Sequence, residues 1–101
     1  MNGEQQAELV VPADHPSLAG HFPGNPIVPG VVLIDLAVAA IRGERKLRLA
    51  GAPNLKFLRP VLPGERVTLY WRWHGELVRF RCVSGEFERV QGSLSFTGDA
   101  G

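Results

Sequence analysis

The stretch GHFPGNPIVPGVVLIDLAVAAI, residues 20–41, decides the fold of this chain. It begins as a loop rich in glycine and proline and continues from Val31 to Ile41 as an apolar run that one acid, Asp35, interrupts. Neither helical nor strand spacing gives this run a polar face, and a segment that is apolar all round is buried all round. Its eleven residues are too few to cross a bilayer. The run therefore predicts a helix in the core.

Proline and glycine mark the two ends of this predicted helix. Pro29 and Gly30 stand at the start, where the fixed φ of proline is tolerated, and Gly43 is placed to end the helix. A helix of about three turns would then need cover on most sides. One sheet from one subunit covers only part of such a helix, so we expect a homodimer.

The first candidate for chemistry is Asp35, in the middle of the helix. A buried carboxylate is costly unless it is paired or hydrogen-bonded, and burial favours its neutral form, which can donate a proton. A structural acid explains this residue equally well when it is considered alone. His21, which lies 14 residues earlier in the Gly- and Pro-rich loop, favours a catalytic site. Backbone N–H groups near Gly30 would point out of the helix N-terminus, where they can bind an oxyanion.

The motif GHFPGNPIVPGVVLID resembles the signature of the hot-dog-fold 3-hydroxyacyl-[acyl-carrier-protein] dehydratases of bacterial fatty acid synthesis. A second segment, LKFLRPVLPGERVTL from Leu55 to Leu69, is similar to the strand and PG turn that follow the central helix there. The resemblance implies that His21 is the catalytic histidine, Asp35 the catalytic acid and Gly30 the glycine whose backbone N–H binds the thioester carbonyl. It also implies an active site shared across a dimer, with no cofactor.

Within that family the acid is Glu in one branch and Asp in the other, which also includes a dehydratase/isomerase, and this chain has Asp35. The housekeeping dehydratases carry a helix and further strand material before the first strand expected here. The lead-in HPSLAGHFPG and the short length resemble the short dehydratases of gene clusters for aryl polyenes and similar pigments. The expected reaction is the reversible removal of water from a 3-hydroxyacyl thioester, on an acyl carrier protein, to give the trans-2-enoyl thioester.

Two other functions stay open at this point. A hot-dog thioesterase would use an acid to activate water and cleave the thioester, and a catalytically silent subunit would bind acyl chains or pair with an active partner. Isomerisation of the product, the acyl chain and the choice between carrier protein and coenzyme A also stay open, because one architecture carries several chemistries. The substrate tunnel is expected to be apolar and to include residues near Phe22, Ile27 and Val28.

Composition sets the limits of these expectations. The chain has 101 residues, which predicts a single domain over residues 1–101, and 45% of them are hydrophobic, as in ordinary globular proteins. The net charge of +1 gives no general attraction to nucleic acid. The one cysteine, Cys82, is expected to be a core residue, and neither it nor the three histidines show the spacing of metal ligands. Without a signal-like N-terminus or a membrane-spanning run, a cytoplasmic location is expected.

Cations gather after the predicted helix, between Arg42 and Lys56. One interpretation is a solvated helix end and linker, because cations are favoured near a helix C-terminus. The other is a docking patch for an acidic carrier protein, with an encounter that charge would steer. The residues of this docking prediction are Arg42, Lys46, Arg48 and Lys56.

The rest of the chain predicts strands separated by glycine- and proline-marked turns. The expected strands span Ala7 to Val11, Asn54 to Arg59, Arg66 to His74, Leu77 to Ser84 and Phe87 to Thr97. Alternation predicts that each of the last three has one apolar face, which makes an antiparallel meander. One strand, a buried helix and four further strands predict an α+β fold in which the sheet wraps around one helix, the hot-dog fold that the motif implies.

Structural explanations are favoured for three further residues. His15 lies between Asp14 and Pro16 in a turn-like context, which favours a bracing role in the loop. Trp71 and Trp73 are in register with the apolar residues of their strand, so we expect them to pack in the core or at a dimer interface.

Overall fold

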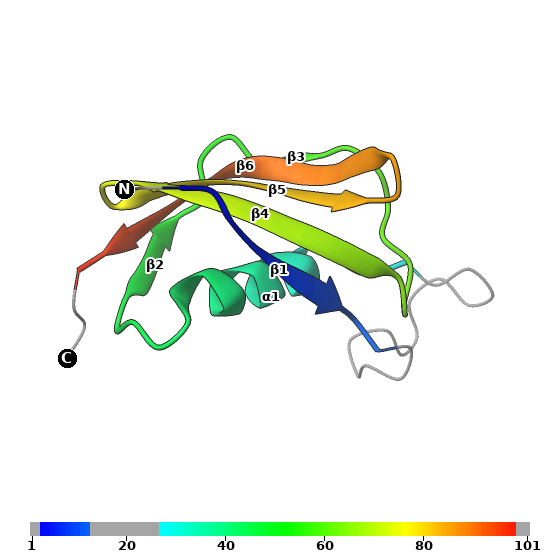
Figure 1. The fold of residues 1–101 in the computed structure, drawn as a ribbon, viewed down its shortest axis with the longest axis horizontal. Coiled ribbons are helices and arrows are strands. Elements are labelled where there is room, and N and C mark those ends of the chain that lie inside the picture. Colours follow the sequence, from blue (N-terminus) through cyan, green and yellow to red (C-terminus); the bar gives the residue numbers. More distant parts are fainter. Residues whose placement is uncertain (1–2, 13–26, 99–101) are drawn as a thin grey trace.

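The computed structural model describes residues 3–12 and 27–98 (Figure 1). Within these ranges one helix, α1 (Gly30–Arg42), lies under one face of a six-stranded antiparallel sheet (Figure 1). The strands are β1 (Gln5–Val10), β2 (Arg48–Gly51), β3 (Lys56–Phe57), β4 (Arg66–His74), β5 (Leu77–Ser84) and β6 (Phe87–Thr97). This arrangement confirms the α+β fold with an antiparallel sheet around one helix.

The sheet follows the order β1-β4-β5-β6-β2, and β3 pairs with β6 as well. Strand β6 therefore has two partners along the same edge, with Phe57 of β3 opposite Val90 and Leu49 of β2 opposite Phe96. The chain between β2 and β3 passes close to Gly92, where a Cβ atom would lie 2.9 Å from the carbonyl oxygen of Asn54. A glycine at this position lets the connection lie directly on β6.

The inward residues of the three long strands form the core, as their alternation predicts. The fully buried members of β4, β5 and β6 include Val67, Leu69, Val78, Cys82, Val90 and Leu94. The Cys82 thiol is completely inaccessible, and burial raises its pKa to about 12. Such a thiol stays protonated at neutral pH, so the prediction of a core cysteine is confirmed.

Some predicted boundaries were wrong. The predicted strand over Asn54 to Arg59 is reduced to the two residues of β3, because the N–H groups of Leu58 and Arg59 both donate to the carbonyl of Arg89 and end the ladder. Strand β2 lies in the segment that was interpreted as helix end and linker. Its residues are mostly exposed, so no apolar alternation marks it, and only pairing with β6 makes it a strand.

In the single chain the helix is buried on one side only, which agrees with the expectation that one sheet covers part of it. Leu33, Ile34, Ala37 and Ile41 are buried towards the sheet, whereas a stripe of Val31, Asp35 and Ala39 is exposed. The physical reason is that one sheet covers one side of a helix only. Asp35 is therefore not a buried carboxylate in this chain. No helix in the described part of the chain is long and apolar enough to span a membrane.

Candidate active site

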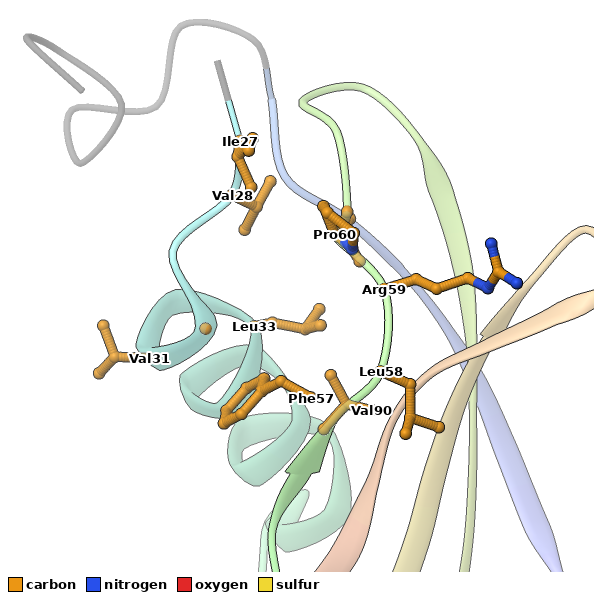
Figure 2. A pocket seen from close by; sticks show the side chains of 11 residues that line it. Ile27, Val28, Val31, Leu33, Phe57, Leu58, Arg59, Pro60 and Val90 are labelled. Carbon is orange, nitrogen blue, oxygen red and sulfur yellow. The ribbon is translucent and has the colours of Figure 1, made fainter. Parts of the chain in front are cut away.

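A pocket of about 490 Å³ lies at the N-terminal end of α1 (Figure 2). Its volume is within the range of small-ligand sites. Three segments and one residue of β6 form it: the chain that enters the helix, the first turn of α1, the segment from Phe57 to Val61 that leaves β3, and Val90. In Figure 2, Leu33 points from the helix towards the segment that carries Arg59 and Pro60, and Val31 lies on the opposite side of the helix.

The helix start lies at this pocket, and no side chain of the described residues caps it. Pro29 is the N-cap residue, with φ −59° and ψ 138°, and its carbonyl accepts the N–H of Val32 at 3.0 Å. The first N–H groups of an α-helix have no intrahelical acceptor. Gly30, the first helical residue, is also one of the residues that line the pocket. A backbone donor at the positive end of the helix dipole can stabilise an oxyanion or polarise a carbonyl there.

The ring of Phe57 packs directly on Gly30, which explains the glycine. A Cβ atom at Gly30 would lie 2.6 Å from Cε1 of Phe57, inside any normal contact distance. Phe57 itself is 55% exposed and forms part of the pocket lining. Any side chain at residue 30 would therefore displace the ring and change the wall of the pocket.

The structure brings together some of the predicted site residues. Ile27, Val28 and Gly30 line the pocket. Asp35 is not among the lining residues and lies on the exposed stripe of α1. The predicted residues His21 and Phe22, like His15, lie outside the described residues.

Sequence reasoning missed the wall formed by residues 57–61. Its backbone is tied to the helix entrance, because the N–H of Val28 donates to the carbonyl oxygen of Val61 at 2.8 Å, and both side chains are buried. The exposure of Phe57 and Leu58 marks this segment as unlike an ordinary strand. In the sequence these two residues belong to an apolar run that Pro60 interrupts. Only the fold shows which element this run faces.

The predicted docking cations separate in the fold. Arg42 is the last residue of α1, Lys46 and Arg48 follow it, and all three are exposed. Lys56 lines a different feature, a polar hollow of about 490 Å³ over β4, β5, β6 and β3. We call this feature the basic hollow; Arg72, Arg79 and Arg81 also line it, together with His74 and the acid Glu4.

The sheet that wraps one helix, with a pocket at the helix start, defines the chain as a hot-dog-fold protein. The chain belongs to the ApeI-like family, described as ApeI dehydratase, which it matches over residues 1–93. The predicted resemblance to hot-dog dehydratases is thereby confirmed.

Curated relatives carry the name 3-hydroxyacyl-[acyl-carrier-protein] dehydratase FabZ. The protein from Rhizobium etli is 33% identical over 104 residues, which cover 90% of this chain and 64% of the relative. The protein from Brucella abortus is 36% identical over 88 residues, which cover 73% of this chain and 55% of the relative. The chain thus spans less than two thirds of the length of these relatives.

Solved structures agree with this assignment. The dehydratase heterocomplex ApeI:P from Xenorhabdus doucetiae matches with a TM-score of 0.81 and 25% identity, over 92% of this chain and 86% of that chain. An uncharacterised protein from Erwinia carotovora matches with a TM-score of 0.72 and 28% identity, over 96% of this chain and 85% of that chain. An acyl-CoA hydrolase mutant from Staphylococcus aureus shares only the fold, at 14% identity and a TM-score of 0.59, over 94% of this chain and 65% of that chain.

Proposed function

We propose that this protein removes water from a 3-hydroxyacyl thioester, carried by an acyl carrier protein, to give the trans-2-enoyl thioester. The observation that carries the proposal is the apolar pocket that Gly30 lines at the start of the helix, in a chain of the ApeI-like dehydratase family. The names of the FabZ relatives support the substrate class. The proposed pathway is fatty acid or aryl polyene-type biosynthesis.

In the proposed mechanism His21 takes the proton from the carbon next to the thioester carbonyl. The Gly30 N–H stabilises the negative charge that develops on the carbonyl oxygen. Asp35 donates a proton to the leaving hydroxyl, so that the carbon–oxygen bond at C3 breaks and one water departs as the double bond forms. The two proton transfers are each expected to contribute about 10² to 10⁴ in rate.

The proposal includes a homodimer that shares its active sites. Val31, Asp35 and Ala39 are one helical turn apart and form an exposed stripe, and Val31 is 66% exposed. A second copy laid against this stripe would remove apolar surface from water. It would also give Asp35 a route into the pocket of the neighbouring subunit. The relative from Xenorhabdus doucetiae is described as a heterocomplex, so a second type of subunit is the alternative occupant of this face.

We further propose that the acidic carrier protein docks on the basic hollow rather than on the segment after the helix. Arg72 and Arg79 are directly opposite each other in the β4–β5 ladder, where like charges are destabilising. Among the described residues neither has an acidic partner within 4.0 Å, whereas Arg81 is paired with Glu4 at 3.5 Å. An acidic surface placed on this face would relieve the repulsion between the two guanidinium groups.

The basic hollow also lies next to the pocket. Strand β3 separates the two, because Lys56 lines the hollow and its neighbour Phe57 lines the pocket. A carrier protein bound to this face would be separated from the pocket only by β3, which has two residues, and would present its thioester across that strand. The face does not suit self-association, because a second copy would bring its own arginines against these.

The proposal includes a cytoplasmic location. It rests on the single cysteine, Cys82, because proteins of oxidising compartments more often carry paired cysteines. Cell fractionation with an antibody against the protein tests this part.

The decisive experiment is intact mass spectrometry of a carrier protein loaded with a 3-hydroxyacyl chain, before and after incubation with the protein. We expect the loss of one water with the wild-type protein, and a rate lower by about 10² to 10⁴ with His21→Ala. The matched control is His74→Ala for turnover of a short pantetheine thioester, because His74 is exposed at the end of β4, away from the pocket. Loss of the whole acyl group would identify a thioesterase instead, and binding without any mass change would identify a silent subunit.

A further inference from the structure

Arg89, in β6, holds the segment that forms the outer wall of the pocket. Its Nη1 donates to the carbonyl oxygen of Pro60 at 2.6 Å, and its Nη2 lies 2.8 Å from Oε2 of Glu65. Nη2 also donates to the carbonyl oxygen of Ser84 at 3.3 Å. The Arg89 side chain is 17% exposed and the Glu65 side chain 21%, so this ion pair is largely shielded from water.

Glu65 connects strand β5 to the segment that follows the pocket wall. Its Oε2 accepts the hydroxyl of Ser84 at 2.6 Å, and its Oε1 accepts the N–H of Leu62 at 3.0 Å. Burial raises the pKa of Glu65, but the two hydrogen bonds and the charge of Arg89 outweigh it and lower the pKa below its usual 4.5. The carboxylate therefore stays charged at neutral pH. Its contribution to stability is present above the usual carboxyl pKa and is lost as the pH falls through the lowered value.

The backbone of Arg89 makes further contacts with the wall. Its carbonyl oxygen accepts the N–H of Leu58 at 2.7 Å and that of Arg59 at 3.3 Å. Residues 58–60 are therefore held by one residue of β6, through both its backbone and its side chain. All three of these residues line the pocket.

The held segment is in turn linked to the helix start. The carbonyl oxygen of Val61 accepts the N–H of Val28, two residues before Gly30, and the ring of Phe57 packs on Gly30 itself. A displacement of the Pro60 region would therefore move both the apolar wall and the backbone that precedes the Gly30 N–H. Displacements of about 1 Å in a catalytic geometry can cost about 100-fold in rate.

Stability alone is a weak explanation for a largely shielded ion pair such as Arg89–Glu65. Replacing a buried ion pair by apolar side chains is often neutral or stabilising. The Nε–H of Arg89 is also buried and has no acceptor within the described part of the structure, which costs free energy. Only a forked donor such as guanidinium, however, suits a carbonyl and a carboxylate at the same time.

We propose that Arg89 is a positioning residue for the dehydration: by holding Pro60 and Glu65 it fixes the wall of the pocket and the place of the Gly30 N–H. This inference rests on the proposed function. Arg89 does not touch the substrate, and it acts through residues 58–61 and Val28.

The test compares Arg89→Met and Arg89→Lys with the wild-type protein on a short 3-hydroxyacyl pantetheine thioester. We expect Arg89→Met to lower kcat about 10- to 100-fold with little change in KM, because the lost alignment matters most in the transition state. Arg89→Lys keeps the positive charge but loses the forked pair of donors, so its kcat should lie between that of Arg89→Met and that of the wild-type protein. The matched control is Arg66→Met, which removes an exposed arginine paired with Glu8 at 3.7 Å, away from the pocket.

A second readout is independent of activity. We expect the amide of Val28, whose N–H donates to the carbonyl oxygen of Val61, to exchange with deuterium faster in Arg89→Met, while the amides of the β4–β5 ladder keep the protection they have in the wild-type protein. If Arg89→Met does not fold, Glu65→Gln, which keeps the shape and removes the charge, takes its place in both measurements. A folded variant with wild-type kcat and unchanged exchange at Val28 would overturn the inference. An inactive wild-type protein would overturn the proposed function, and the exchange of the Val28 amide would still decide the positioning role.

Discussion

Gly30 meets two separate demands at one residue. It starts the helix at the pocket, where a free N–H is the feature that the proposed chemistry uses, and it leaves room for the ring of Phe57. The first demand concerns only the backbone, which most residues could satisfy in a first helical turn. The second demand excludes any side chain as long as Phe57 keeps its place.

Gly30→Ala tests the contact between Gly30 and Phe57. The new methyl group would meet Cε1 of Phe57 at 2.6 Å, and the exposed ring can move away, so we expect a small change in melting temperature but a reduction in kcat/KM of about tenfold, since the pocket wall shifts. Steady-state kinetics and thermal unfolding measure both. The double variant Gly30→Ala/Phe57→Ala should lose less kcat/KM than the losses of the two single variants combined, because the clash between residue 30 and the ring is absent. Additive losses would show that the ring is not the cause.

At the scale of elements, the helix α1 is covered on one side only. The sheet buries Leu33, Ala37 and Ile41, while Val31, Asp35 and Ala39 face away from it. One acid and two apolar side chains therefore lie on the uncovered side of the helix. The proposed dimer accounts for the apolar members of the stripe and for the acid together.

Ala39→Arg tests whether this stripe is an interface. An arginine in place of the small Ala39 is too large for a packed helix face, so we expect monomers in size-exclusion chromatography and loss of dehydration. Glu44→Arg introduces the same side chain at an exposed residue just past the helix and should leave mass and activity unchanged. An Ala39→Arg protein that keeps both the mass and the activity of the wild type would contradict the shared site.

At the scale of the whole molecule, the two faces of the sheet have different characters. The inner face carries the apolar core and the helix, and the outer face carries the basic hollow. The net charge of +1 conceals this separation, because acids elsewhere offset the cations. Local charge, rather than total charge, decides where an acidic partner binds.

The double variant Arg72→Glu/Arg79→Glu tests carrier docking on this face. We expect KM for the carrier-bound substrate to rise about tenfold or more, and added salt to lower this KM instead of raising it, because an attractive surface becomes repulsive. Turnover of the short pantetheine thioester should not change. Arg48→Glu, from the segment after the helix, should behave like the wild type. A rise in KM with Arg48→Glu and none with the double variant would place docking on the segment that the sequence first indicated.

The sequence alone determined the helix, through its apolar run with proline and glycine at the ends, and the three long strands, through their alternating apolar residues. The motif around Gly30 also indicated the family, because its glycines and prolines determine the local backbone geometry and need no partner that is distant in the chain. Tertiary structure decided the features that depend on partners distant in the chain. Strand β2 exists because β6 pairs with it, and the wall at residues 58–61 faces the helix because Arg89 holds it there. Asp35 is exposed because a single sheet covers one side of a helix, which no pattern within the helix can express.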